Sequence, residues 1–175
     1  MKRLWAPWRE TYITRLTTKQ NSCVFCRIHA AGKDKQNLVF IRKPSAYGVL
    51  NLYPYGNGHC LVVPNRHVSD ISKLSQEEYG VLMELVRETK DLLQAALGPQ
   101  GFNVGLNLGR IAGAGIPGHV HIHVVPRWKG DHNFMPVTAS TKVISQSLSV
   151  IYKKLVAAYK QASVLMLDTH RSSQP

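Results

Sequence analysis

Acidic residues are scarce in this chain of 175 residues, which has 10 Asp and Glu against 22 Lys and Arg. The formal charge of +12 at pH 7 favours anionic partners: nucleotides, phosphorylated metabolites, nucleic acid or an anionic membrane surface. Basic runs and aromatic RNA-binding motifs are also missing, because the Lys and Arg residues are scattered. We therefore expect a small anionic substrate and no specific binding of nucleic acid.

Long apolar runs are absent as well. No stretch of 18 apolar residues occurs, so we expect no transmembrane helix. The N-terminal stretch MKRLWAPWRETYI has neither a continuous apolar region nor an A-x-A-like cleavage site, so we expect no signal peptide. The chain has three cysteines, and an odd number without an export signal is typical of a reducing compartment. These features predict a cytoplasmic protein that does not associate with membranes.

No internal repeat and no linker divides the chain, and 44% hydrophobic residues are enough for one substantial core. We expect an N-terminal extension over residues 1–22, whose aromatic side chains dock on the body or contact a partner. A domain over residues 23–160 and a polar tail over residues 161–175 would follow. The chain is therefore expected to form a single domain.

Short apolar runs between turn residues predict strands over residues 38–41, 47–52, 59–63 and 102–108. The sequence Ser75-Gln-Glu-Glu78 matches a capping box and predicts a helix that ends at Gly98-Pro99. A second amphipathic pattern predicts a helix over residues 142–159. With one further strand described below, the expected class is α+β, an antiparallel sheet of about five strands with two main helices.

The most informative stretch is GHVHIHVVPRW, residues 118–128. Its histidines, His119, His121 and His123, alternate with aliphatic residues, and a period of two is that of a strand. The imidazoles would then line one face, about 6.6 Å apart, and the strand should end at Pro126. Such a row of imidazoles suits either nucleophilic attack on a phosphate or the binding of a metal ion.

A glycine-rich segment over residues 109–118 comes directly before the histidines. Its four glycines allow the backbone to approach a ligand closely and to direct N–H groups at an anion. The segment is either a phosphate-binding loop or a simple connector between strands. The amide of Asn107, just upstream, could add a further donor to a phosphate.

Cys23-Val-Phe-Cys26 follows Asn-Ser and is expected in a loop or turn. Two thiolates at this spacing can bind one zinc ion, whereas a redox pair would follow a strand and begin a helix. A purely structural role is the third possibility. Two further metal ligands would have to come from elsewhere in the chain.

His119-Val-His-Ile-His123-Val-Val resembles the signature of the histidine triad (HIT) superfamily. The stretch from Asn51 to His67 is similar to the family's nucleoside-binding strand and turn, and the stretch from Phe102 to Asn107 is similar to the strand before the triad. Leu-Trp-Ala-Pro-Trp-Arg near the N-terminus and Val-Pro-Arg-Trp after the triad resemble the bacterial diadenosine tetraphosphate phosphorylase and hydrolase-like branch. The resemblance implies a HIT-like fold that forms a two-fold homodimer.

The resemblance also implies roles for single residues. His121 would be the nucleophile, and His123 would bind the scissile phosphate and help to protonate the leaving group. Related nucleotidyltransferases have Gln at the position of His123, so histidine favours hydrolysis or phosphorolysis. Asn107 would contact the phosphate or the leaving group, Asn51 would bind the ribose hydroxyls, and Leu52 would line the base pocket.

Zinc-carrying members of the family use four positions, all of which match here: Cys23, Cys26, His67 and His119. The resemblance thus implies a structural zinc ion and no organic cofactor. Many members carry a Ser or Thr hydroxyl for the leaving group shortly before the triad, where this chain has Gly115. Backbone N–H groups near Gly113 and Gly115 could replace that hydroxyl.

The function that the resemblance implies is cleavage of a nucleotide phosphoanhydride through a nucleotidyl intermediate on His121. The expected substrate is a dinucleoside polyphosphate such as diadenosine tetraphosphate, with water or phosphate as the acceptor and an adenosine nucleotide favoured. Two alternatives are a nucleoside phosphoramidase, which hydrolyses P–N bonds, and a nucleotide-binding module with little turnover.

Overall fold

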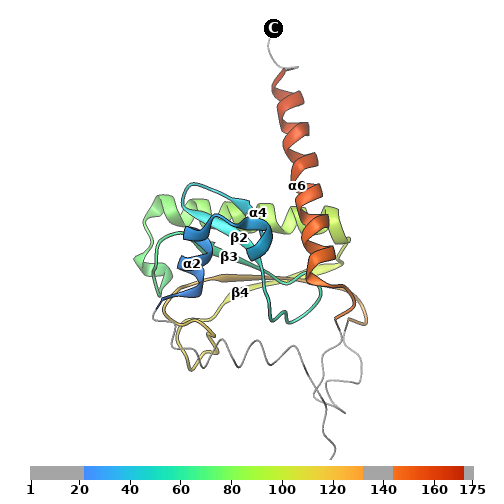
Figure 1. Ribbon diagram of the computed structural model, residues 1–175. Coiled ribbons are helices and arrows are strands. Elements are labelled where there is room, and N and C mark those ends of the chain that lie inside the picture. Colours follow the sequence, from blue (N-terminus) through green and yellow to red (C-terminus); the bar gives the residue numbers. More distant parts are fainter. Residues whose placement is uncertain (1–21, 132–143, 172–175) are drawn as a thin grey trace, which may run out of the picture.

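The protein is described here from a computed structural model, which places residues 22–131 and 144–171. A five-stranded antiparallel sheet with the strand order β1-β2-β3-β5-β4 forms its centre (Figure 1). The strands are β1 (Val39–Arg42), β2 (Ala46–Leu50), β3 (Cys60–Pro64), β4 (Gly101–Leu106) and β5 (Ile122–Arg127). The α+β class and the five strands confirm the prediction from the sequence.

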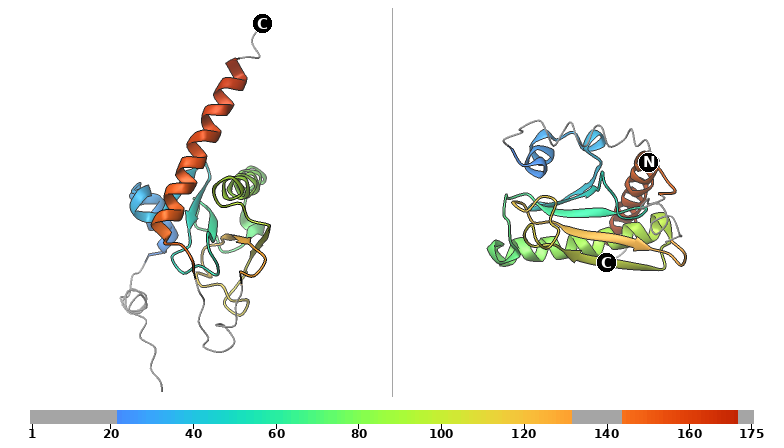
Figure 2. Two further views of the ribbon diagram at one scale, coloured as in Figure 1. Left: turned by 90° about the vertical axis from the view of Figure 1, so that its right-hand side faces the viewer. Right: turned by 90° about the horizontal axis from the view of Figure 1, so that it is seen from below.

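Helices cover both faces of the sheet. They are α2 (Val24–Ala31), α3 (Asp34–Asn37), α4 (Gln76–Leu97) and α6 (Leu148–Arg171), with a short 3-10 helix, η1 (Ile71–Lys73). Helices α4 and α6 pack on one face, α2 lies on the other, and the second half of α6 projects away from the body (Figure 2). Among the described residues no helix combines the length and the apolar character needed to span a bilayer.

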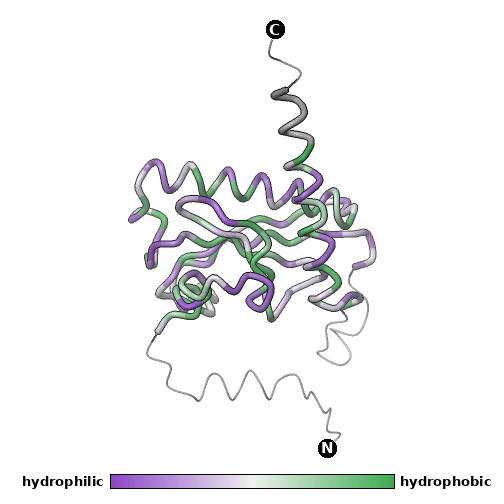
Figure 3. Tube along the Cα trace, turned by 45° about the horizontal axis from the view of Figure 1, so that its top comes forward, coloured by the Kyte–Doolittle hydropathy of each residue, from purple (hydrophilic) through white to green (hydrophobic). Residues whose placement is uncertain are grey.

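Alternation along the strands produces two hydrophobic clusters, one on each face of the sheet. Hydrophobic residues concentrate in the strands at the centre of the molecule (Figure 3). The larger cluster joins the sheet to α4 and α6, and it includes Leu50, Val62, Ile122 and Val124. The smaller cluster lies under α2 and contains Phe25, Val39, Tyr47, Val49, Leu61 and Val63. Strands β1, β2, β3 and β5 are thus mostly buried, β4 is partly exposed, and α2 is held by the smaller cluster.

Helix α4 begins and ends where the sequence predicts. The Ser75 hydroxyl accepts a bond from the Glu78 N–H, and the Glu78 carboxylate accepts one from the Ser75 N–H, which completes the capping box. Gly98, with φ at +58°, provides the left-handed residue that ends the helix.

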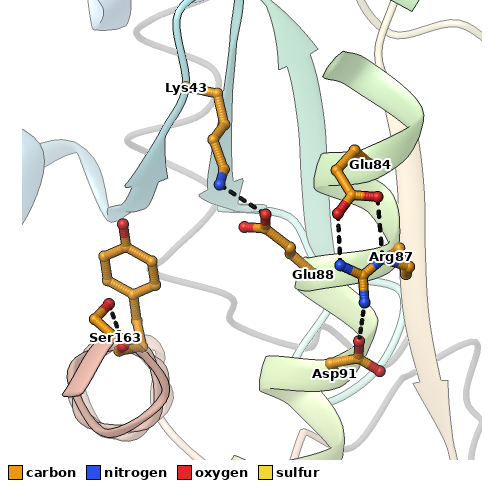
Figure 4. Close-up of polar contacts among 7 residues, drawn as sticks. Lys43, Glu84, Arg87, Glu88, Asp91 and Ser163 are labelled. Carbon is orange, nitrogen blue, oxygen red and sulfur yellow. Dashed lines mark hydrogen bonds and ion pairs between the residues drawn. The ribbon is translucent and has the colours of Figure 1, made fainter. Parts of the chain in front are cut away.

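Ion pairs tie α4 to the sheet and stabilise its surface (Figure 4). Lys43, just after β1, donates to Glu88 at 2.6 Å and links the β1–β2 turn to the helix. On the exposed side Arg87 pairs with Glu84 and Asp91, one turn away in each direction. These exposed pairs contribute at most about 1 kcal/mol each, so burial of the two hydrophobic clusters dominates the stability.

The histidine-rich stretch differs from its predicted conformation. Strand β5 begins only at Ile122, so His119 and His121 precede the strand, and it continues through Pro126 to Arg127. Pairing with β3 ends at Val124, and beyond this point β5 pairs with β4 alone. A strand with one free side tolerates proline, which explains why the predicted end at Pro126 was wrong.

Helix α2 was not predicted, and the predicted loop at Cys23–Cys26 was wrong: Cys23 caps this helix and Cys26 lies in its first turn. A helix of eight residues is too short for a periodic pattern to identify it reliably. The C-terminal helix α6 begins at Leu148 and runs to Arg171, into the segment predicted as a polar tail. Nearly all of the predicted N-terminal extension, residues 1–22, lies outside the described residues.

Candidate functional site

The three triad histidines lie on the α2 side of the sheet, whereas Ile122 and Val124 between and after them face the α4 side. The rings of His121 and His123 are 5.0 Å apart. The Phe25 ring lies 5.0 Å from the ring of His121 and 5.5 Å from that of His119. The alternation thus places all three imidazoles beside α2, although only His123 is in a strand.

His121 has a defined tautomer. Its Nδ1 atom is 2.9 Å from the carbonyl oxygen of His119, and a carbonyl can only accept a hydrogen bond. Nδ1 therefore carries the proton and Nε2 carries a lone pair. Burial lowers the pKa of His121 below its ordinary value, so the ring is neutral near pH 7. A neutral imidazole with an unprotonated Nε2 is a competent nucleophile.

His123 has the opposite tautomer, and a fourth histidine determines it. The Tyr55 N–H donates to Nδ1 of His59 at 2.9 Å, so His59 carries its proton on Nε2. That Nε2–H donates to Nδ1 of His123 at 2.9 Å, which leaves the proton of His123 on Nε2. This Nε2 atom is buried and has no hydrogen-bond partner among the described residues. Burial and the neighbouring His121 lower the pKa of His123 to about 4.

His59 is the functional residue that the sequence analysis missed. It is completely buried, and the Tyr55 ring packs 4.6 Å from its ring and 5.4 Å from that of His123. The sequence shows a histidine at the start of a strand, after the turn glycine Gly58. Strand β3 pairs with β5, with Leu61 opposite His123, and this pairing brings His59 beside His123. Nothing in the sequence indicated that these two strands are neighbours.

The predicted nucleoside-binding residues follow β2. The Asn51 carboxamide lies beside the histidines, with its Nδ2 atom 3.3 Å from Nδ1 of His59, and its Oδ1 atom accepts the Tyr53 N–H at 2.9 Å. Leu52 is 45% exposed and therefore available to a ligand. Asn107 follows β4 and approaches the Gly113 carbonyl oxygen at 3.5 Å.

The glycine-rich segment is folded by its own hydrogen bonds. The Gly113 N–H donates to the Arg110 carbonyl at 3.0 Å, and the Ala114 N–H donates to the Gly109 carbonyl at 3.2 Å. These two N–H groups stabilise the turn and are not directed at an anion. Around Gly115 there is open space in the described part of the chain, since an added Cβ atom would meet no atom within 4 Å.

Cys23, Cys26, His67 and His119 converge from three separate segments, and their four ligand atoms lie within 4.8 Å of one another. His119 Nδ1 is 3.4 Å from Cys23 Sγ, 3.6 Å from Cys26 Sγ and 3.3 Å from His67 Nδ1. A tetrahedral zinc ion with ordinary bond lengths places S and N ligands about 3.5 Å apart and two N ligands about 3.3 Å apart. The four residues therefore fit a closed zinc site.

Contacts around the cluster support this fit. The Nε2 atom of His119 lies 2.9 Å from the Pro64 carbonyl oxygen, so it carries the proton and leaves Nδ1 with a lone pair toward the cluster. The Val120 N–H donates to the Val68 carbonyl at 2.7 Å, which joins the two histidine-bearing segments directly beside their ligands. The predicted ligand set thus has the donor atoms and the orientation that a zinc ion requires.

Comparison with known proteins identifies relatives along most of the chain. The model of the HIT domain matches residues 33–130. An AP-4-A phosphorylase of Mycobacterium tuberculosis is 41% identical over 155 residues, which cover 85% of this chain and 79% of that protein. An adenosine 5'-monophosphoramidase of Schizosaccharomyces pombe is 32% identical and covers 61% of this chain and 74% of its own length.

A solved structure with a similar fold is described as zinc-bound. The zinc-bound histidine triad family protein of Mycobacterium smegmatis superimposes with a TM-score of 0.68 at 25% identity. The match covers 83% of this chain and 98% of that protein.

Proposed function

This chain belongs to the HIT domain family, and we propose that it is an enzyme that cleaves a phosphoanhydride bond of a nucleotide. The favoured substrate is a dinucleoside polyphosphate with adenosine, such as diadenosine tetraphosphate, by analogy with the AP-4-A phosphorylase at 41% identity. The observation that carries the proposal is the complementary protonation of two neighbouring histidines: His121 offers a lone pair at Nε2, and His123 offers a proton at Nε2.

In the first step Nε2 of His121 attacks an α-phosphorus atom and forms a P–N bond. The P–O bond to the leaving nucleotide breaks, and the His123 Nε2–H donates a hydrogen bond or its proton to the departing oxygen. For diadenosine tetraphosphate the leaving group is ATP and the intermediate is adenylyl-His121. His59 keeps the proton of His123 on the side of the substrate.

In the second step the acceptor oxygen attacks the same phosphorus atom and releases His121. Water as the acceptor yields AMP, and inorganic phosphate yields ADP. We favour phosphate, because the relative at 41% identity is named a phosphorylase and the open space at Gly115 leaves room for a second anion. Asn107 would contact the transferred phosphate, and Asn51 and Leu52 would bind the nucleoside.

The cluster of two cysteines and two histidines would hold a structural zinc ion. When bound, the ion cross-links α2 to the segments that precede η1 and β5. The free thiols of all three cysteines are compatible with the cytoplasm, which we propose as the location.

The direct test is His121→Ala with diadenosine tetraphosphate as substrate. We expect kcat to fall by at least about a thousandfold, because the variant lacks the nucleophile of the proposed first step. Nucleotide affinity, measured by calorimetry, should change little. His29→Ala, which removes an exposed histidine outside the site, is the matched control. Full turnover by the His121 variant would contradict the proposal.

A second candidate is hydrolysis of a nucleoside phosphoramidate by the same residues, which the similarity to the S. pombe phosphoramidase supports. The two activities separate in one product analysis. The enzyme is incubated with diadenosine tetraphosphate, with and without phosphate, and with adenosine 5'-phosphoramidate. A higher kcat/KM for the phosphoramidate would favour the second candidate, and no turnover of either would favour a binding module.

A further inference from the structure

The metal cluster and the nucleophile share one residue. The side chain of His119 points its Nδ1 atom at the cluster, 3.4 Å from Cys23 Sγ and 3.3 Å from Nδ1 of His67. The main-chain carbonyl of the same His119 accepts the Nδ1–H of His121 at 2.9 Å. A movement of His119 therefore changes the hydrogen bond that determines the tautomer of the nucleophile among the described residues.

A second connection runs through packing. Phe25 lies between Cys23 and Cys26 in the sequence, and its ring packs against the rings of both His119 and His121. Its carbonyl oxygen accepts the Tyr47 hydroxyl at 2.9 Å, and Tyr47 is completely buried in β2. The start of α2 thus carries the two cysteine ligands, Cys23 and Cys26, and also Phe25, whose ring packs against His121.

We propose that the metal site positions the nucleophile: zinc bound by Cys23, Cys26, His67 and His119 holds the His119 carbonyl and the Phe25 ring where they orient His121. His119 and Phe25 are then positioning residues, and zinc acts on catalysis through them. This inference rests on the proposed function of His121. It goes beyond a structural zinc, because it assigns the metal an effect on the reaction rate of the folded enzyme.

The physical reason is that an ion would add bonds that are stronger than the contacts that now join the ligand side chains. Four metal-ligand atoms from three segments face one another, and thiol–imidazole contacts of 3.3 to 3.6 Å link them. An ion would replace these contacts with four coordinate bonds and fix the distances between the segments. Because a displacement of about 1 Å at a reacting group can cost about a hundredfold in rate, a loosened His119 should be visible in kcat.

The first experiment removes zinc with a chelator from protein whose histidines carry ¹⁵N. Two-dimensional NMR at constant pH reports which ring nitrogen of His121 bears the proton, and circular dichroism reports the fold. We expect zinc loss to convert His121 from the single Nδ1–H form to a mixture of tautomers and to lower kcat about tenfold or more. Unchanged His121 signals in folded, zinc-free protein would overturn the proposal.

A second experiment restores the site without refolding. His67 is the most exposed ligand and has no contact with the nucleophile among the described ring contacts, so His67→Gly leaves a surface gap that free imidazole can fill. We expect kcat to recover with imidazole in parallel with bound zinc, at constant circular dichroism. His29→Ala with imidazole is the control and should show no change. Recovery of zinc without recovery of kcat would contradict the proposal.

Phe25→Leu provides a test that does not depend on the fold of zinc-free protein. The variant keeps all four ligands, so its zinc content should stay at one ion per chain while the His121 signals shift and kcat falls. Full zinc with unchanged signals and unchanged kcat would overturn the packing connection. The NMR readout also separates this proposal from the proposed enzymatic function. If no nucleotide is turned over, the proposed enzymatic function is wrong. The effect of zinc on the His121 tautomer can still be measured in that case.

Discussion

At the scale of residues, two hydrogen-bond chains determine which nitrogen atoms can react. One begins at the His119 carbonyl and leaves Nε2 of His121 unprotonated. The other begins at the Tyr55 N–H, passes through His59 and leaves Nε2 of His123 protonated. Burial lowers the pKa of both catalytic histidines, so each ring is neutral near pH 7 and these tautomers persist.

This arrangement predicts that His59 acts through His123, and that the hydrogen-bond donor at Nε2 of His59 is the group that supports turnover. A glutamine at position 59 can put a donor nitrogen near the position of Nε2, whereas an asparagine is too short to reach it. We expect His59→Asn to lower kcat about a hundredfold and His59→Gln to retain most of it, measured by steady-state kinetics with diadenosine tetraphosphate.

The matched pair separates a positioning role from a packing role, because both variants place an amide in the same buried site. Equal loss in the two variants would mean that packing of the imidazole, and not its Nε2–H donor, supports activity, and the proposed chain from His59 to His123 would be wrong. The thermal midpoint of each variant serves as the control for folding.

The sequence alone identified several residues of the candidate site, because their side-chain chemistry forms recognisable patterns. Alternation of histidine and aliphatic residues indicated a site, and the resemblance to the HIT superfamily assigned the four ligands that converge in the structure. The fourth histidine, His59, could not be assigned from its own neighbours, because its role depends on pairing between β3 and β5. The roles of Asn51, Leu52, Asn107, Gly113 and Gly115 in binding substrate are still predictions.

At the scale of elements, predictions were accurate where a local rule decides the structure. The capping box and Gly98 set the limits of α4, and short apolar runs gave the strands of the sheet. Predictions were wrong where a tertiary contact decides. Helix α2 depends on its own Phe25, which packs against the sheet in the smaller cluster. Strand β5 continues past Pro126 because its pairing with β3 has already ended at Val124.

Strand β4 lies at one edge of the sheet, with β1 at the other, and it leads to a prediction at the scale of elements. Its sequence, GFNVGL, carries no charge, and Val104 is 49% exposed. An uncharged edge strand offers unpaired backbone groups to another strand, so we propose that the chain forms a homodimer in which β4 pairs with its copy. Val104→Glu would place a carboxylate from each copy in this interface and should weaken the dimer at least about tenfold, or about 1.4 kcal/mol.

Analytical ultracentrifugation over a range of concentrations measures this effect. Val104→Thr keeps the branched shape without a charge and should leave the dimer intact, which makes it the matched control. A wild-type protein that is monomeric, or a Val104→Glu variant that dimerises as tightly as wild type, would exclude β4 as the interface.

At the scale of the whole molecule, the sheet separates the larger hydrophobic core on one face from the candidate site on the other. Helices α4 and α6 bury the larger cluster on one face, and α2 lies on the other (Figure 2). The four metal-ligand residues and the triad histidines lie on the α2 side. The formal charge of +12 suits attraction of a polyphosphate to such a site. This arrangement places the four metal-ligand residues directly beside His121 and His123 on one face of a small domain.

The central claim is that His121 forms a covalent nucleotidyl intermediate, and stereochemistry at phosphorus tests it most directly. The substrate is diadenosine tetraphosphate with a phosphorothioate of known configuration at each α-phosphorus, and the configuration of the ADP or isotopically labelled AMP analogue is measured. Two successive in-line displacements give net retention, which is the result we predict. Net inversion would mean a single direct attack by the acceptor and would contradict the covalent role of His121.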